Sequence, residues 1–140
     1  MDDALKSLMD AKTIAVAGLD DRMSRTAYQI ASYLQSAGYR IIPVPVQQPA
    51  VEVLGETAYE RIQDIPEHVD LVDVFVRSEQ TDAVIDDAIA AGVGAIWLQQ
   101  GIHNDAGLER ARTAGIVATQ DRCTMVEHRW ASRQAQIGAK

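Results

Sequence analysis

The first residues that could do chemistry lie in the loop of residues 18–25. Gly18 ends an apolar stretch, and the loop leads directly into a segment with helical spacing. The free N–H groups at a helix start favour a phosphate, and Ser24 and Arg25 add a hydroxyl and a guanidinium that also bind phosphate. This pattern indicates a phosphate site. The same pattern is equally well explained by structure alone, if Gly18 only makes a tight turn and Ser24 only caps the helix.

Two further side chains that could react or bind follow predicted strands. Arg77 ends an apolar strand, where it could bind an anion or could only pair with Glu79 or another surface carboxylate. Cys123 lies beyond the last predicted strand and near a helix start, whose dipole favours a thiolate. It is a candidate reactive thiol, and the alternative is a half-buried cysteine without reactivity.

Other chemistries lack the residues they need. The strand that ends at Val44 is followed by a proline, a valine and two glutamines, without the acidic residue that binds the ribose of NAD. Asp20 and Asp21 stand where a phosphate-accepting receiver domain has its acidic pair, but the aspartate that should end the third strand and the lysine that should end the fifth are missing. A Gly-x-Ser-x-Gly motif and paired metal ligands are missing too. His68, His103 and His128 stand singly and are expected at the surface or in turns.

The elements that must position these loops are visible in the hydrophobic pattern. Five apolar stretches have the composition of strands buried on both faces, at residues 13–18, 40–44, 71–76, 95–99 and 116–119. Segments with helical spacing alternate with them, at residues 3–9, 27–37, 79–91, 105–114 and 125–136. Residues 45–64 look irregular, apart from a short helical turn near 59–63. The alternation predicts a doubly wound α/β fold with a five-stranded parallel sheet, in which ligands bind at the carboxyl ends of the strands.

Length and composition limit the class of protein. A chain of 140 residues can bury one core but not two, so we expect a single domain over residues 1–140. A formal net charge of -7 disfavours unspecific binding to nucleic acid, so an anionic ligand must be bound locally. With one cysteine, no long apolar run and no export signal at its start, the sequence predicts a cytoplasmic protein without a membrane span.

Several short motifs occur in a distinctive order along the chain. They are Ile-Ala-Val-Ala-Gly-Leu at residues 14–19, Ser-Arg-Thr-Ala-Tyr at 24–28, Tyr-Arg-Ile-Ile-Pro-Val at 39–44, Ile-Trp-Leu-Gln-Gln-Gly at 96–101 and Asp-Arg-Cys at 121–123. Together they resemble the small single-domain CoA-binding proteins, relatives of the nucleotide-binding domain of the succinyl-CoA synthetase alpha subunit. Such proteins usually read Arg-Pro-Ser-Tyr where this chain has Arg-Thr-Ala-Tyr at 25–28, and Val-Asn-Pro where it has Val-Pro-Val at 44–46.

The resemblance implies a Rossmann-like site for coenzyme A or an acyl-CoA. It implies that the diphosphate lies over Gly18, Leu19 and Ser24, and that the adenosine lies along Pro43 and Val44. It also implies that the pantetheine arm passes the ends of the third and fourth strands, at Phe75, Val76, Arg77, Leu98, Gln99, Gln100 and Gly101. Ligase activity is not implied, because the phosphohistidine of the synthetase and its partner belong to other domains.

We therefore predict a cytoplasmic CoA-binding protein without catalysis of its own. From charge alone, Arg25 and Arg40 are the candidates for the ribose phosphate of the ligand. Two alternatives stay open, an enzyme that uses Cys123 to exchange thiols with CoA disulfides and a regulatory module that senses NAD or another nucleotide. Trp97 is expected in the core. Trp130 is expected to pack the last helix against the domain or against a second subunit, which makes a homodimer a further expectation.

Overall fold

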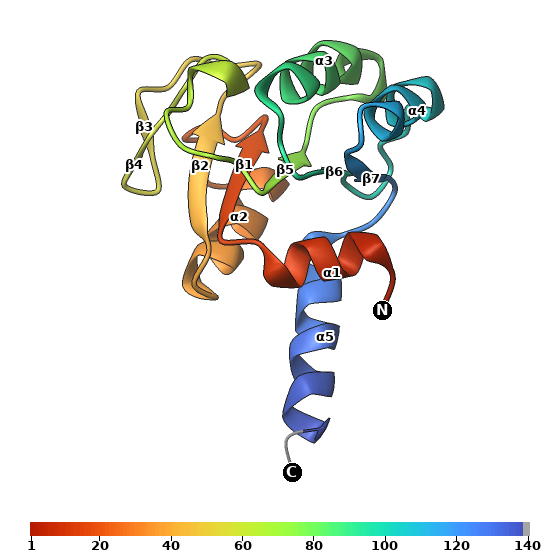
Figure 1. Cartoon of the computed structure of the whole chain (residues 1–140). Coiled ribbons are helices and arrows are strands. Elements are labelled where there is room, and N and C mark those ends of the chain that lie inside the picture. The colour runs from red at the N-terminus through yellow and green to blue at the C-terminus, as the bar shows by residue number, and fades with distance from the viewer. Residues whose placement is uncertain (139–140) are drawn as a thin grey trace.

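The computed structural model describes residues 1–138, and its centre is a parallel sheet of five strands (Figure 1). The spatial order of the strands is β2-β1-β5-β6-β7. Their bounds are β1 (Thr13–Ala17), β2 (Arg40–Val44), β5 (Leu71–Val74), β6 (Ala95–Leu98) and β7 (Val117–Thr119). The chain steps from β1 outward to β2 and then returns past β1 to β5. The strand order therefore reverses between β1 and β5, which is where this kind of sheet opens a crevice at its carboxyl edge.

Five α-helices cover the two faces of the sheet, as the alternation in the sequence predicts. They are α1 (Asp3–Asp10), α2 (Thr26–Ser36), α3 (Thr81–Ala91), α4 (Asp105–Thr113) and α5 (Thr124–Gly138). Two separate clusters of buried side chains show which helices lie on which face of the sheet. One cluster joins α3 and α4 to the sheet, and the other joins α1, α2 and the start of α5 to the opposite face. The predicted doubly wound α/β fold is confirmed.

The connection between β2 and β5 contains a hairpin that the sequence analysis left out, and a 3-10 turn that overlaps the helical turn predicted near residues 59–63. It holds a hairpin of two short strands, β3 (Glu52–Val53) and β4 (Glu56–Thr57), and a 3-10 turn, η1 (Ile62–Asp64). Leu54 and Gly55 form the hairpin turn with φ values of 54° and 75°, the left-handed pair that a tight hairpin needs. The interpretation of residues 45–64 as irregular was wrong here, because two-residue strands leave no periodic pattern. A second 3-10 turn, η2 (Ser78–Gln80), precedes α3.

The last helix projects away from the rest of the domain (Figure 1). Its first turns pack against α1 and α2, with Thr124 and Ala131 buried, but residues 133–138 are all exposed. Trp97 is buried in β6, as predicted, whereas Trp130 keeps 53% of its surface exposed. Packing of Trp130 against its own domain is therefore a wrong prediction. Within residues 1–138, no helix combines the length and the hydrophobicity that a bilayer crossing requires.

Candidate functional site

A cavity of about 380 Å³ lies at the point where the strand order reverses. Its wall is formed by the loop after β1, the first turn of α2 and the residues that follow β5, namely Gly18, Arg22, Ser24, Arg25, Thr26, Ala27, Gln47, Phe75 and Arg77. Gly18 has a φ of +94°, and a Cβ there would lie 3.2 Å from the backbone carbon and oxygen of Phe75. A glycine is needed because the backbones after β1 and β5 approach each other closely at the floor of this cavity.

The N-terminus of α2 faces this cavity without a side-chain cap. The capping position is Arg25, whose side chain makes no capping hydrogen bond in the described chain, and the predicted cap at Ser24 is wrong. The Arg25 N–H donates to the Arg22 carbonyl at 3.1 Å, so the loop makes a turn before the helix begins at Thr26. Ser24, Arg25 and Thr26 remain exposed. The first N–H groups of α2, with the positive end of its dipole, are therefore open to an anion.

Two of the three arginines around the cavity have no carboxylate partner. Arg22 is bound in two places by the buried Asp20, with Nε 2.9 Å from Oδ1 and Nη2 2.6 Å from Oδ2. The Arg22 guanidinium holds the pKa of Asp20 below its usual range, so this pair is neutral as a unit. Among residues 1–138, neither Arg25 nor Arg77 forms an ion pair, and the pairing of Arg77 with Glu79 considered above is not formed. A chain of net charge -7 thus places two uncompensated cations at one cavity.

Two neighbouring cavities extend this one along the carboxyl edge of the sheet. The first, of about 440 Å³, lies beyond β2 and shares Gln47 with the central cavity; its wall is mainly apolar, with Val44, Pro45 and Val84 among its residues. The second, of about 400 Å³, shares Phe75 and Arg77 with the central cavity and is otherwise lined by Val76, Ser78, Glu79, Gln100, Gly101 and Ile102. We call the three cavities together the edge groove. It is apolar at one end, cationic in the middle and mixed at the other end.

The edge groove gathers most of the residues that the sequence singled out. Nine line it directly: Gly18, Ser24, Arg25, Val44, Phe75, Val76, Arg77, Gln100 and Gly101. Leu19, Pro43 and Leu98 are buried beneath it and belong to the core. The sequence analysis passed over Arg22, although it belongs to the β1 loop. It missed Gln47 and the apolar wall from α3 because nothing local marks these residues as neighbours of that loop.

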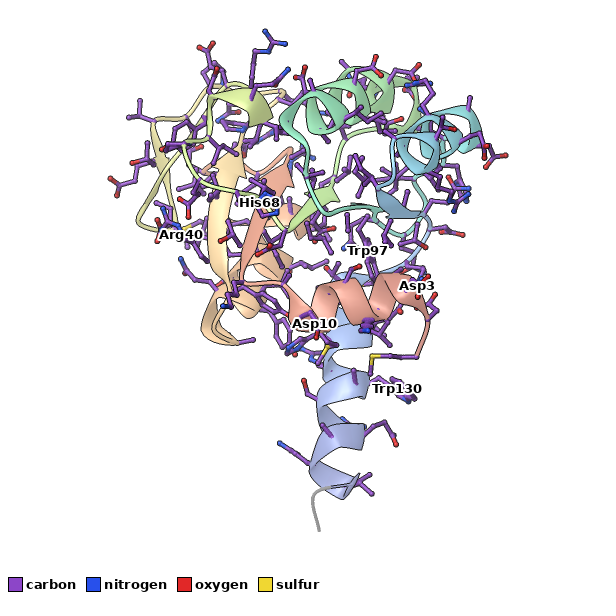
Figure 2. All side chains as sticks on the ribbon, viewed as in Figure 1. Asp3, Asp10, Arg40, His68, Trp97 and Trp130 are labelled. Carbon is purple, nitrogen blue, oxygen red and sulfur yellow. The ribbon has the colours of Figure 1, made fainter. Side chains whose placement is uncertain are left out.

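The structure does not bring Arg40 to the edge groove. Arg40 is the first residue of β2, whereas Val44 at the other end of that strand lines the groove. In Figure 2 its label lies near the lower end of β2, away from the arrowhead. Its Nε lies 2.7 Å from Glu67 Oε2 and its Nη1 lies 3.2 Å from Glu56 Oε2. Glu56 and Glu67 therefore already compensate the charge of Arg40, at the edge of the sheet opposite the groove. The prediction that Arg40 binds the ribose phosphate, which was made from charge alone, finds no support in this position.

A buried carboxyl group lies under the carboxyl edge, and the sequence analysis gave it no role. Asp73 in β5 is 0% exposed. Its Oδ1 accepts a hydrogen bond from Gln99 Nε2 at 3.0 Å, and its Oδ2 accepts one from Thr124 Oγ1 at 2.8 Å. Burial raises the pKa of Asp73 to about 7, although both hydrogen bonds act in the opposite direction. The side chain of Gln99, expected at the pantetheine arm, is therefore engaged in tying β5, β6 and α5 together.

Hydrogen bonds also join the loops that follow β5, β6 and β7. The Gly101 N–H donates to Asp121 Oδ1 at 2.7 Å, and the His103 N–H donates to Ser78 Oγ at 2.9 Å. The Asn104 N–H donates to the Gln120 side chain at 2.8 Å. These bonds form between neighbouring loops, so one end of the edge groove has a connected rim. The free Cys123 is half-buried and packs in the cluster on the α2 and α5 face.

The three histidines do not share one environment. His68 and His103 are exposed, as predicted, but His128 is half-buried in α5 between two tyrosine rings. Its Nδ1 lies 2.7 Å from the Tyr33 hydroxyl, and burial lowers the pKa of its imidazole. Within residues 1–138, no three side chains of His, Cys, Asp or Glu gather so that they could hold a metal ion.

Known proteins share both this sequence pattern and this fold. The family described as CoA binding domain matches residues 12–129. The Bacillus subtilis protein YneT, itself uncharacterized, is 36% identical over 122 residues, which are 86% of this chain and 88% of YneT. A solved structure of a Thermus thermophilus protein has a TM-score of 0.83 and 37% identity, over 89% of this chain and 92% of that one. The alpha subunit of the ADP-forming acetate–CoA ligase I of Pyrococcus furiosus is 26% identical over 97 residues, 66% of this chain but only 21% of that subunit.

Proposed function

This chain belongs to the CoA binding domain family, and on that premise we propose that it binds coenzyme A or an acyl-CoA in the edge groove, without catalysing a reaction of its own. The observation that carries the proposal is the joint presence, at one cavity, of an uncapped helix N-terminus and the unpaired guanidinium groups of Arg25 and Arg77. Coenzyme A carries a diphosphate and a ribose phosphate, which need such a concentration of donors in an otherwise acidic protein.

The central cavity would hold the diphosphate. The first-turn N–H groups of α2 and the Ser24 hydroxyl would donate to its oxygens, and Arg77 would face it from the β5 side. Arg25 is exposed at the outer wall, so it would reach either the diphosphate or the ribose phosphate. Arg22 would add little net charge, because Asp20 already neutralises it.

The two outer cavities would hold the ends of the ligand. The apolar wall beyond β2, with Val44 and Pro45, would receive the adenine ring, and the carboxylates of Glu60 and Asp87 in that wall could accept from its amino group. The uncharged pantetheine arm would pass Phe75 and reach the loop at Gly101. The backbone there is already fixed by Asp121, so the thiol end would meet a preformed surface.

Isothermal titration of the nucleotide-stripped protein with CoA tests this proposal. We expect micromolar binding, which Arg25→Ala and Arg77→Ala each weaken by roughly 5- to 150-fold, the equivalent of about 1–3 kcal/mol for a charged hydrogen bond. Arg40→Ala is the matched control and should bind like the wild type, because Arg40 lies at the opposite edge of the sheet.

The outcomes of these titrations distinguish the proposed function from its two alternatives. Absence of heat with CoA would contradict the proposal, and so would equal losses from Arg25→Ala and Arg40→Ala. Titration with NADH should give no heat, and NADH binding as tight as CoA binding would favour the nucleotide-sensing alternative. Exchange of the Cys123 thiol with CoA disulfide, abolished by Cys123→Ser while CoA binding persists, would favour the enzymatic alternative. We keep the cytoplasm as the proposed location, which a fractionation experiment would test.

A further inference from the structure

The exposed side of α5 carries an ordered stripe of side chains. Val126 is 56% exposed, Trp130 is 53% exposed and Ile137 is 61% exposed, and Arg133 lies between the last two. The spacing of four, three and four residues places all four side chains within a sector of about 60° around the helix. We call these four residues the α5 stripe.

The α5 stripe is an unusual concentration of exposed apolar surface for this chain. Within residues 1–138, seven large hydrophobic side chains are exposed, and three of the seven lie in the stripe. The distal half of α5 leaves the domain (Figure 1), and residues 133–138 are exposed on all sides. Figure 2 shows Trp130 directed outward from this helix. The residues of the described chain therefore do not cover the stripe.

The α5 stripe of one chain can pair with the α5 stripe of a second chain that runs in the opposite direction. If two copies of α5 pair antiparallel about an axis between residues 131 and 132, Val126 faces Ile137 of the second copy and Trp130 faces Arg133 of the second copy. Apolar groups meet at both ends, and a guanidinium meets an indole ring in the middle. The chain already uses this kind of contact twice, with Arg122 4.7 Å from the Trp97 ring centre and Arg129 5.0 Å from the Tyr33 ring centre.

Charge on this side of the molecule also suits a second copy. Although the whole chain has a net charge of -7, residues 124–138 carry two arginines and one glutamate, so two such helices do not add to the acidic repulsion. Arg133 forms no ion pair within residues 1–138. The guanidinium group of Arg133 is therefore available to the indole ring of a second copy.

We propose that the α5 stripe is a self-association surface, through which two copies of this chain pair antiparallel. This inference does not depend on the proposed ligand. A contact made mainly by one helix from each copy is small, so the dimer belongs to the reversible class of interfaces and dissociates on dilution.

Sedimentation velocity of the full chain measures this association directly. From roughly 5 µM to 500 µM, a range suited to small interfaces, the wild type should shift from monomer to dimer. Trp130→Ala combined with Ile137→Glu should raise the dimer dissociation constant at least tenfold, because it removes the indole ring that faces Arg133 and places a carboxylate opposite the apolar Val126. Ala135→Glu is the matched control on the opposite side of α5 and should leave the dissociation constant unchanged. Circular dichroism should show the same helix content in all three proteins.

Disulfide trapping tests the antiparallel register. In a Cys123→Ser background, Val126→Cys chains mixed with Ile137→Cys chains should form mixed dimers on mild oxidation. Ile137→Cys alone should cross-link poorly, because about 16 Å of helix axis would separate the two sulfur positions. Efficient cross-linking of Ile137→Cys with itself would overturn the antiparallel arrangement. A wild type that stays monomeric at the highest concentration would overturn the whole proposal, and binding of that monomer to anionic phospholipid vesicles through Trp130 would identify a membrane surface as the occupant instead.

Discussion

Replacing Asp73 by asparagine should remove a large part of the dependence of folding stability on pH. The pKa of the Asp73 carboxyl rises from its ordinary 3.8 to about 7 on folding, because the group is completely buried in β5. Between these two values the folded chain holds a proton that the unfolded chain releases. The free energy of unfolding therefore falls as the pH rises from about 4 to about 7, and it is insensitive to this group outside that window.

The size of the effect follows from the same two pKa values. The rise of the pKa from 3.8 to about 7 corresponds to roughly 4 kcal/mol over the full window, of which more than half falls between pH 5 and pH 8. An asparagine keeps the shape of the side chain, accepts from Gln99 Nε2 and donates to the Thr124 hydroxyl. Asp73→Asn should therefore be stabilised relative to the wild type, and more so at pH 8 than at pH 5.

Urea unfolding of both proteins at pH 5 and pH 8 measures the difference. Other titrating groups are common to the two chains and cancel, so the change in the mutational free energy between the two pH values reports Asp73 alone. Asp10→Asn, at an exposed carboxyl on α1, serves as the control and should show a much smaller change. If Asp73→Asn has the same effect at pH 5 and at pH 8, the carboxyl does not titrate between them and the reasoning from its burial is refuted.

Two further substitutions test other features of the fold. Gly18→Ala should weaken CoA binding at least tenfold and destabilise the fold by about 1–3 kcal/mol. The φ of +94° at Gly18 and the 3.2 Å between a Cβ there and the Phe75 backbone leave no room for the added methyl group. Titration with CoA and urea unfolding would show both effects, and wild-type behaviour of the variant would contradict the prediction. His128→Gln should lose the acid sensitivity that His128 gives to the wild type. Burial lowers the pKa of this imidazole, so His128 contributes stability that is lost as the pH falls below its ordinary pKa of 6.5. Urea midpoints that change by the same amount in both proteins between about pH 7.5 and pH 5.5 would disprove this.

The sheet could be predicted from the sequence because its strands are mostly apolar runs without alternation. Residues 13–17 and 95–98 are buried on both faces, which leaves no alternation and makes them easy to distinguish from surface strands. The hairpin at Glu52–Val53 and Glu56–Thr57 could not be predicted in this way, because each arm has only two residues. Its one local signal was Gly55, which the turn uses at positive φ.

The candidate site could be predicted only where a residue follows directly from strand order. Gly18 and Arg77 come after strands that turned out to be neighbours, so parallel topology alone places them together. Arg40 was chosen for its charge, although its position at the start of a strand puts it at the other edge of the sheet. The contact of Asp73 with Gln99 and Thr124 joins residues 26 and 51 positions apart, and only the assembled fold aligns them.

The hydrogen bonds between the loops after β5, β6 and β7 also determine how a ligand would be received. These bonds are made entirely by the protein's own groups, which hold the rim at Gly101 and His103 in place. Binding at this end of the groove would then be the docking of a small molecule onto a preorganised surface, with little loss of conformational entropy in the protein. The corresponding amide protons would exchange slowly with solvent in the free protein as well as in the complex, and ligand release would not have to wait for a loop to open.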